Sequence, residues 1–352
     1  MSVYGQTLLG VAVITMETRA TLLVINLVMF FIGIDLLIYK GMGQKEIQPE
    51  CRVIEVPVEP EQEKPSINYD ITTPIPSYLS YGEMVSQLKT WHEEAPELTE
   101  IGTYGKSTKG QDLYYIRINN TRIPSNKPVT LVHATTHGNE PWAGCTVTAY
   151  IGTILDKYGD DEQITNLVDS RDMYFIPIVS PDSHPNSRYV DGVDPNRDYP
   201  TQNSPDKKSV APIQALRDFT LAINPRAAIS GHTWGQLFLY PWGDQNRETP
   251  NNADYLRILG KMRQMSGYSI KQANKLYNRP IYGGEMDWFH RQGAFSIVIE
   301  YGTHQRKPTD VQIKSTFDKT FSAVLHFLEE APKVEVQQWT SDMWAKYISK
   351  AA

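Results

Sequence analysis

Three residues in the middle of the chain have the types and the spacing of a metal site. His137 and Glu140 stand three positions apart in the segment HGNE, which directly follows the apolar run 129–134. Where a strand becomes a loop, residues at this spacing can face one point above the edge of a sheet. Zinc favours such a mixture of imidazole and carboxylate, completed by a third protein ligand and a water. His232, which ends a second apolar run in Ser-Gly-His, is the candidate third ligand.

These segments need a β-sheet to bring them together, and the spacing of apolar residues after residue 76 predicts such a sheet. Met84, Leu88 and Trp91 recur at helical spacing, while continuous apolar runs are typical of strands buried on both faces. We expect strands near 98–104, 113–119, 129–134, 173–179, 227–230 and 295–300, and helices from HGNE to about 155 and near 212–221, 252–265 and 310–328. This alternation indicates an α/β fold with a mixed, mostly parallel central sheet and helices on both faces.

Five sequence blocks stand in the order that characterises a known family. They are the opening pattern at 78–118, HGNE, the segment DPNR at 194–197, the segment GHTWG that contains His232, and FSIVIEYGTH, which contains Glu300. Over about residues 78–330 the chain therefore resembles the zinc metallocarboxypeptidases of the carboxypeptidase A/B/D type. The resemblance implies a zinc carboxypeptidase-like fold, peptidase activity, and one Zn²⁺ per chain held by His137, Glu140 and His232.

The resemblance also implies which residues act on the reacting bond. Glu300 matches the general base, which takes a proton from water and passes it to the leaving amine. A glutamate after the apolar run Phe-Ser-Ile-Val-Ile would otherwise be a costly buried charge. Arg188 matches the arginine that stabilises the oxyanion. The segment SPDS at 180–183 stands where the family usually has an NPDG turn, which affects the loop that carries Arg188.

The DPNR segment resembles the part of the family that holds the end of the substrate. Asn196 and Arg197 match the pair that binds the terminal carboxylate, a task that suits a planar guanidinium. Asp194 matches the residue behind the metal ligands that orients the ring of His137. Pro195 departs from the family, because a flexible residue usually separates the aspartate from the asparagine.

Positions around the segment GGEMDW concern the side chain of the substrate. The tyrosine that closes over the substrate in the family matches either Tyr277 or Tyr282, and we expect Tyr282. Met286 falls at the position that sets side-chain preference and predicts an apolar pocket. The neighbouring Glu285 could shift that preference towards basic or amino-bearing residues, so the specificity stays open at this point.

The beginning of the chain predicts a membrane anchor. Residues 20–39 form an apolar run, interrupted only by Asn26 and Asp35, that is long enough to cross the roughly 30 Å of a bilayer's hydrocarbon core. A buried core helix and a cleaved signal peptide are the alternatives, but the run has no polar face and no small-residue cleavage site follows it. We expect a single-pass membrane protein with its catalytic domain on the extracytoplasmic side. The sparse flanking charges leave the orientation open, and Met1 and Met16 are both candidate starts.

Composition divides the 352 residues into four segments. They are an N-terminal segment with the apolar run (1–41), a Pro/Glu-rich linker (42–76), the catalytic domain (77–331) and a C-terminal tail (332–352). The linker carries six of the 23 prolines and -4 of the net charge of -6, which is typical of an extended spacer. The net charge of -6 argues against nucleic acid as a general partner, because binding it needs a basic face. Two cysteines, Cys51 and Cys145, exclude a disulfide scaffold and a cysteine-built zinc module.

We therefore expect a zinc metallocarboxypeptidase that removes the C-terminal residue of a peptide. One alternative keeps the chemistry and changes the substrate to a muropeptide of the cell wall, cleaved between D-glutamate and a diamino acid, which a tethered enzyme would reach. Another alternative is an inactive module that binds carboxylate ends, although the set His137, Glu140, His232 and Glu300 is intact. The sequence does not indicate an oligomeric state.

Overall fold

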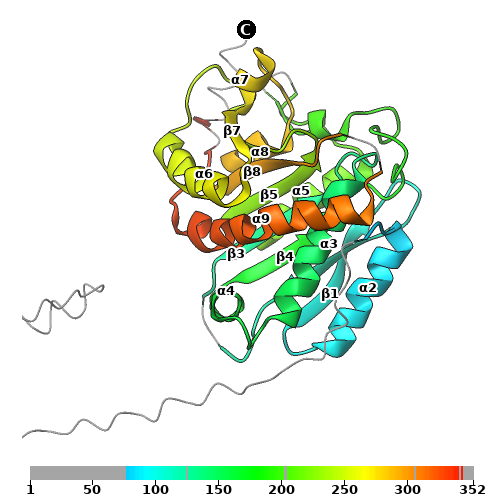
Figure 1. Ribbon diagram of the computed structural model, residues 1–352. Helices are drawn as coiled ribbons and strands as arrows, with labels where there is room; N and C mark the ends of the chain where they lie inside the picture. Colours follow the sequence, from blue (N-terminus) through cyan, green and yellow to red (C-terminus); the bar gives the residue numbers. More distant parts are fainter. Residues whose placement is uncertain (1–76, 124–125, 202–203, 305–306, 341, 344–352) are drawn as a thin grey trace, which may run out of the picture. The chain divides into compact units, whose positions relative to one another are not determined.

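A computed structural model describes residues 77–123, 126–201, 204–304, 307–340 and 342–343 (Figure 1). The run 20–39, which is predicted to cross a membrane, and the linker 42–76 lie outside the described residues, so both stay predictions. Within the described residues, no helix combines the length and the apolar character that a bilayer crossing needs.

A mixed eight-stranded sheet forms the centre of the domain, with the strand order β1-β2-β4-β3-β5-β8-β6-β7. Four of its seven neighbouring pairs are parallel, namely β3 with β4, β3 with β5, β5 with β8 and β6 with β7, which confirms the predicted mixture. The strands are β1 (Thr99–Lys106), β2 (Asp112–Ile118), β3 (Val129–Ala134), β4 (Asp172–Ile176), β5 (Ala227–Thr233), β6 (Leu237–Tyr240), β7 (Ser269–Gln272) and β8 (Phe295–Tyr301).

Helices cover both faces of the sheet, as the continuous apolar runs predicted. On β3, Val132 packs into a large core cluster with residues of α2, α3, α4, α6 and α9, whereas its neighbour Leu131 packs into a second cluster with residues of α5 and α8. Figure 1 shows α9 and α3 lying together across one face of the sheet. The helices are α2 (Tyr81–Glu94), α3 (Pro141–Asp156), α4 (Glu162–Ser170), α5 (Ala211–Ile223), α6 (Asn252–Ser266), α7 (Ala273–Tyr277), α8 (Glu285–Arg291) and α9 (Asp310–Glu330), with short 3₁₀ turns η1 (Pro195–Arg197) and η2 (Ala331–Lys333).

Local sequence explains where the two flanking helices begin. In α2, Ser80 and Glu83 form a capping box, and the predicted stripe Met84, Leu88 and Trp91 is buried against the core. In α9, Thr309 and Gln312 form a second capping box. Both helices therefore combine a defined start with an apolar face that the sheet covers.

The parallel strands bring the chemically interesting segments to one edge of the sheet. β3, β5 and β8 are adjacent and point the same way, so the loop after β3 and the ends of β5 and β8 meet. The register places His232 on β5 opposite Glu300 on β8. A crevice outside the carboxyl ends of parallel strands is where open α/β sheets bind ligands.

Candidate active site

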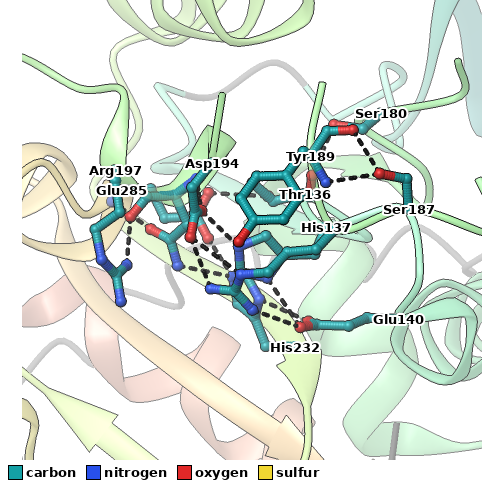
Figure 2. Close-up of polar contacts among 12 residues, drawn as sticks. Thr136, His137, Glu140, Ser180, Ser187, Tyr189, Asp194, Arg197, His232 and Glu285 are labelled. Carbon is teal, nitrogen blue, oxygen red and sulfur yellow. Dashed lines mark hydrogen bonds and ion pairs between the residues drawn. The ribbon is translucent and has the colours of Figure 1, made fainter. Parts of the chain in front are cut away.

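The three predicted metal ligands converge at this edge of the sheet (Figure 2). His137 lies in the loop after β3, Glu140 immediately precedes α3, and His232 lies near the end of β5; all three are buried. Glu140 stands between the two rings, with Oε1 2.9 Å from Nδ1 of His137 and Oε2 2.8 Å from Nδ1 of His232. One ligand atom from each residue lies within 4.8 Å of the others, which brings the predicted set together as a candidate metal site.

A second carboxylate holds the far side of each imidazole. Asp194 Oδ1 lies 2.9 Å from Nε2 of His137, and Glu285 Oε1 lies 2.5 Å from Nε2 of His232. When Nε2 carries the proton and donates it to a carboxylate, Nδ1 keeps its lone pair for a metal. Both rings therefore present Nδ1 towards Glu140, and Asp194 lies at the far nitrogen of His137.

Glu285 has a contact with His232 that the sequence did not reveal. The sequence left open whether it shifts the side-chain preference, but it does not line the cavity beside the metal-binding residues and lies fully buried beneath His232. Its Oε2 accepts hydrogen bonds from the hydroxyls of Thr136 at 2.9 Å and Tyr199 at 3.5 Å. As the first residue of α8, it points towards β5, and no sequence spacing relates it to His232.

Electrostatics within the cluster favour a bound cation. Burial alone would raise the pKa of Glu140, but His232 and His137 outweigh it and lower that pKa to about 2. Burial likewise acts to raise the pKa of Glu285, and His133 and His232 bring it down to about 2. Burial acts to lower the pKa of His232, whereas Glu140 and Glu285 raise it well above its ordinary value. Two imidazoles, each held by a second carboxylate, and the carboxylate of Glu140 form a donor set that fits zinc.

Glu300 and Arg188 border the same cavity, which measures about 580 Å³. Oε2 of Glu300 is shielded from solvent and has no hydrogen-bond partner among the described residues. Burial raises the pKa of Glu300 to about 7, and the nearby Glu140 adds to the rise. Arg188 pairs with Asp194 at 2.9 Å, and its guanidinium lies 3.6 Å from Oε1 of Glu140.

The DPNR segment forms the turn η1 beside the metal ligands. The side chain of Asp194 accepts a hydrogen bond from the backbone N–H of Asn196 at 3.0 Å, which caps the turn and explains the local fold. Asn196 Oδ1 accepts the backbone N–H of Glu285 at 2.9 Å. Asn196 and Arg197 both line the cavity. Gly283 has a φ of +70°, and a Cβ there would lie 2.6 Å from the carbonyl oxygen of Arg197, so glycine permits this close approach.

The two candidate tyrosines differ in their position relative to the cavity. Tyr277, at the end of α7, lines the cavity, whereas Tyr282 is not part of its wall. The positive φ of Asn278 ends α7 and leaves Tyr277 beside the cavity, a loop conformation that the sequence did not specify. Met286 also lines the cavity.

These features define a class of enzyme. A buried His–Glu–His donor set with a free carboxyl group beside it, at the carboxyl edge of a mixed α/β sheet, is the site of a zinc-dependent hydrolase. Residues 84–323 match the family model described as zinc carboxypeptidase. The chain belongs to the zinc carboxypeptidase family, and zinc is therefore its cofactor.

Individual relatives are distant but cover most of the chain. A zinc carboxypeptidase of Simulium vittatum is 24% identical over 73% of this chain and 97% of its own length. Human carboxypeptidase B is 23% identical over 70% of each chain. Among solved structures, bovine thrombin-activatable fibrinolysis inhibitor superposes with a TM-score of 0.65 at 17% identity, covering 74% of this chain and 99% of that one. Carboxypeptidase A from Helicoverpa armigera gives 0.60 at 18% identity, covering 79% and 75%. These structures show the shared fold.

The contact between Glu285 and His232 predicts a role in metal affinity. Replacing Glu285 with Gln keeps the shape but removes the charge that makes the ring a better donor, so we expect zinc affinity to fall about 10- to 100-fold. Competition with a chromophoric chelator measures this affinity. Thr136→Val, which removes only a hydroxyl bonded to Glu285, is the matched control and should cause a smaller loss. Wild-type affinity in Glu285→Gln would contradict the role.

Proposed function

We propose that the protein is a carboxypeptidase that hydrolyses the C-terminal peptide bond of a peptide, with Glu300 as general base. One observation carries the proposal: Glu300 and Arg197 line the same cavity as the metal-binding residues. A base and a carboxylate-binding cation in one cavity with a metal site suit a substrate whose scissile bond is next to its free carboxyl end. Zinc, when bound, polarises a carbonyl group and makes water more acidic.

Arg197 and Asn196 are the proposed anchor for the terminal carboxylate. Among the described residues, no carboxylate forms an ion pair with Arg197 within 4.0 Å. Its guanidinium is half-buried, and burial lowers its pKa without removing its charge at neutral pH. A partly dehydrated guanidinium binds a carboxylate through two parallel hydrogen bonds, which fixes the orientation of the substrate's end.

Glu300 and Arg188 are the proposed catalytic residues. The unpartnered Oε2 of Glu300 is able to accept a proton from water and then deliver it to the leaving nitrogen. The guanidinium of Arg188 lies at the edge of the cavity, where it would donate hydrogen bonds to the oxygen that becomes negative. Its ion pair with Asp194 keeps it in that position.

The cavity is apolar where the terminal side chain would lie. Leu237, Leu239, Ala273, Met286 and Val298 form one apolar cluster along its wall. The acid in this wall, Asp287, already accepts hydrogen bonds from the backbone N–H groups of Gly243 at 2.9 Å and Asp244 at 2.8 Å. Burial raises the pKa of Asp287 well above its ordinary value, and Asp244 adds to the rise. Its carboxyl oxygens are therefore already engaged by the backbone of the loop, and we propose large apolar C-terminal residues as substrates.

Capping of the bound substrate is proposed for Tyr277. Its side chain is 45% exposed and stands at the cavity wall, so it is free to move over a substrate. Attachment to a membrane through residues 20–39, with the domain on the extracytoplasmic side, stays part of the proposal and rests on the sequence alone.

The raised pKa of Glu300 predicts a pH dependence. A base must be ionised, so kcat/KM should rise with pH through the pKa of Glu300, and a bound cation places the midpoint below about 7 because it favours the carboxylate. Glu300→Gln should lower kcat/KM by about 10²- to 10⁴-fold and abolish this acidic limb. Steady-state kinetics on a blocked dipeptide across the acidic and neutral range measure both effects. A Glu300→Gln variant with wild-type kinetics would refute the assignment.

The apolar wall predicts substrate preference. A blocked dipeptide ending in Phe should show a kcat/KM at least about 100-fold higher than one ending in Lys, because a buried ammonium group would lack a partner. Met286→Asp should narrow this ratio by adding a charge to the wall, whereas Met286→Leu is the matched control. Preferred release of a diamino acid from a muropeptide would instead favour the cell-wall alternative. Stoichiometric zinc with no turnover on any substrate would favour the binding module.

A further inference from the structure

The chain that follows α9 packs back onto the domain, where it contacts Arg291 at the end of α8. We call residues 334–339 the C-terminal strap. Val334 and Val336 are buried in the main core cluster, and the backbone N–H of Trp339 donates to the carbonyl oxygen of Arg291 at 2.8 Å. The strap lies beyond the 84–323 segment that matches the family model, so the family match does not explain it.

The indole of Trp339 covers a buried charge. The guanidinium of Arg291 lies 4.4 Å from the ring centroid of Trp339 and 4.6 Å from that of Trp242. Arg291 is 1% exposed and pairs with both carboxylate oxygens of Asp244 at 2.7 Å. Both charges of a buried ion pair have lost their water, so the pair depends on its geometry and on the groups that cover it. The indole rings provide that cover and attract the cation.

Asp244 belongs to the loop that builds the cavity wall. The backbone N–H groups of Gly243 and Asp244 both donate to the carboxyl group of Asp287. The carbonyl oxygen of Gly243 accepts the backbone N–H of Ile281 at 2.8 Å. Gly243, Ile281 and Asp287 all line the substrate cavity. Contacts therefore run without interruption from Trp339 through Arg291 and Asp244 to this wall.

We propose that the C-terminal strap is a positioning element for the substrate cavity, with Trp339 acting through Arg291 and Asp244 on the loop that carries Gly243. The proposal rests on the proposed function for the identity of the substrate. Trp339 does not line the substrate cavity, whereas Gly243 of the loop does, beside the wall proposed for the terminal side chain. The strap therefore affects substrate binding and side-chain preference while metal binding and the chemical step are unchanged.

Steady-state kinetics of the full chain carrying Trp339→Ala test this role. KM for a blocked dipeptide ending in Phe should rise between about three- and thirtyfold, the range expected from losing a desolvated cation–π contact. The value of kcat and the zinc content should stay at wild-type levels. Trp339→Phe should restore most of the wild-type KM, because it keeps an aromatic face. Gln338→Ala, a change at the exposed neighbouring residue, is the matched control and should have no effect.

Hydrogen exchange of the Gly243 and Asp244 amides provides a readout that needs no turnover. Both amides should exchange faster in Trp339→Ala than in the wild type and in Gln338→Ala. Unchanged exchange and unchanged KM would overturn the proposal, and so would parallel losses of kcat and zinc, which indicate general destabilisation. If the wild type hydrolyses no peptide, the proposed function fails, while faster exchange would still support the strap's effect on the wall.

Discussion

The two imidazoles of the metal site are held between carboxylates, and the surrounding structure depends on this arrangement. Glu140 stands between His137 and His232, while Asp194 and Glu285 hold their outer nitrogens. Buried carboxylates are costly unless each is paired and hydrogen-bonded. The start of α3, the capped turn η1 and the start of α8 each supply one of these carboxylates, so the positions of three separate segments are tied to the chemistry of one site.

Much of the fold and the metal site follows from local sequence. The continuous apolar run of β3 and the stripe of Met84, Leu88 and Trp91 in α2 can each be recognised from neighbouring residues alone. Both elements lie where they were predicted. The candidate metal ligands could also be recognised locally, because His137 and Glu140 share one short segment after a strand and His232 ends another strand. Because β3 and β5 pair in parallel, their carboxyl ends lie side by side and bring these residues together.

Other features depended on contacts between distant segments. Glu285 reaches His232 across 53 positions, and only the packing of α8 beneath β5 reveals the pair. The choice between Tyr277 and Tyr282 depended on how the loop after α7 bends, which composition does not determine. Short elements such as β6, β7 and α7 carry too few residues for a periodic pattern. The strap's effect on the cavity wall likewise requires three-dimensional contacts.

Zinc titration of the purified full chain tests the central claim most directly. After metal removal, zinc is returned stepwise while the release of a C-terminal residue from a blocked peptide is followed. A single catalytic site built by His137, Glu140 and His232 predicts that activity returns in proportion to added zinc and reaches its maximum at one ion per chain. Full activity without zinc, or activity that continues to rise well beyond one ion per chain, would contradict it.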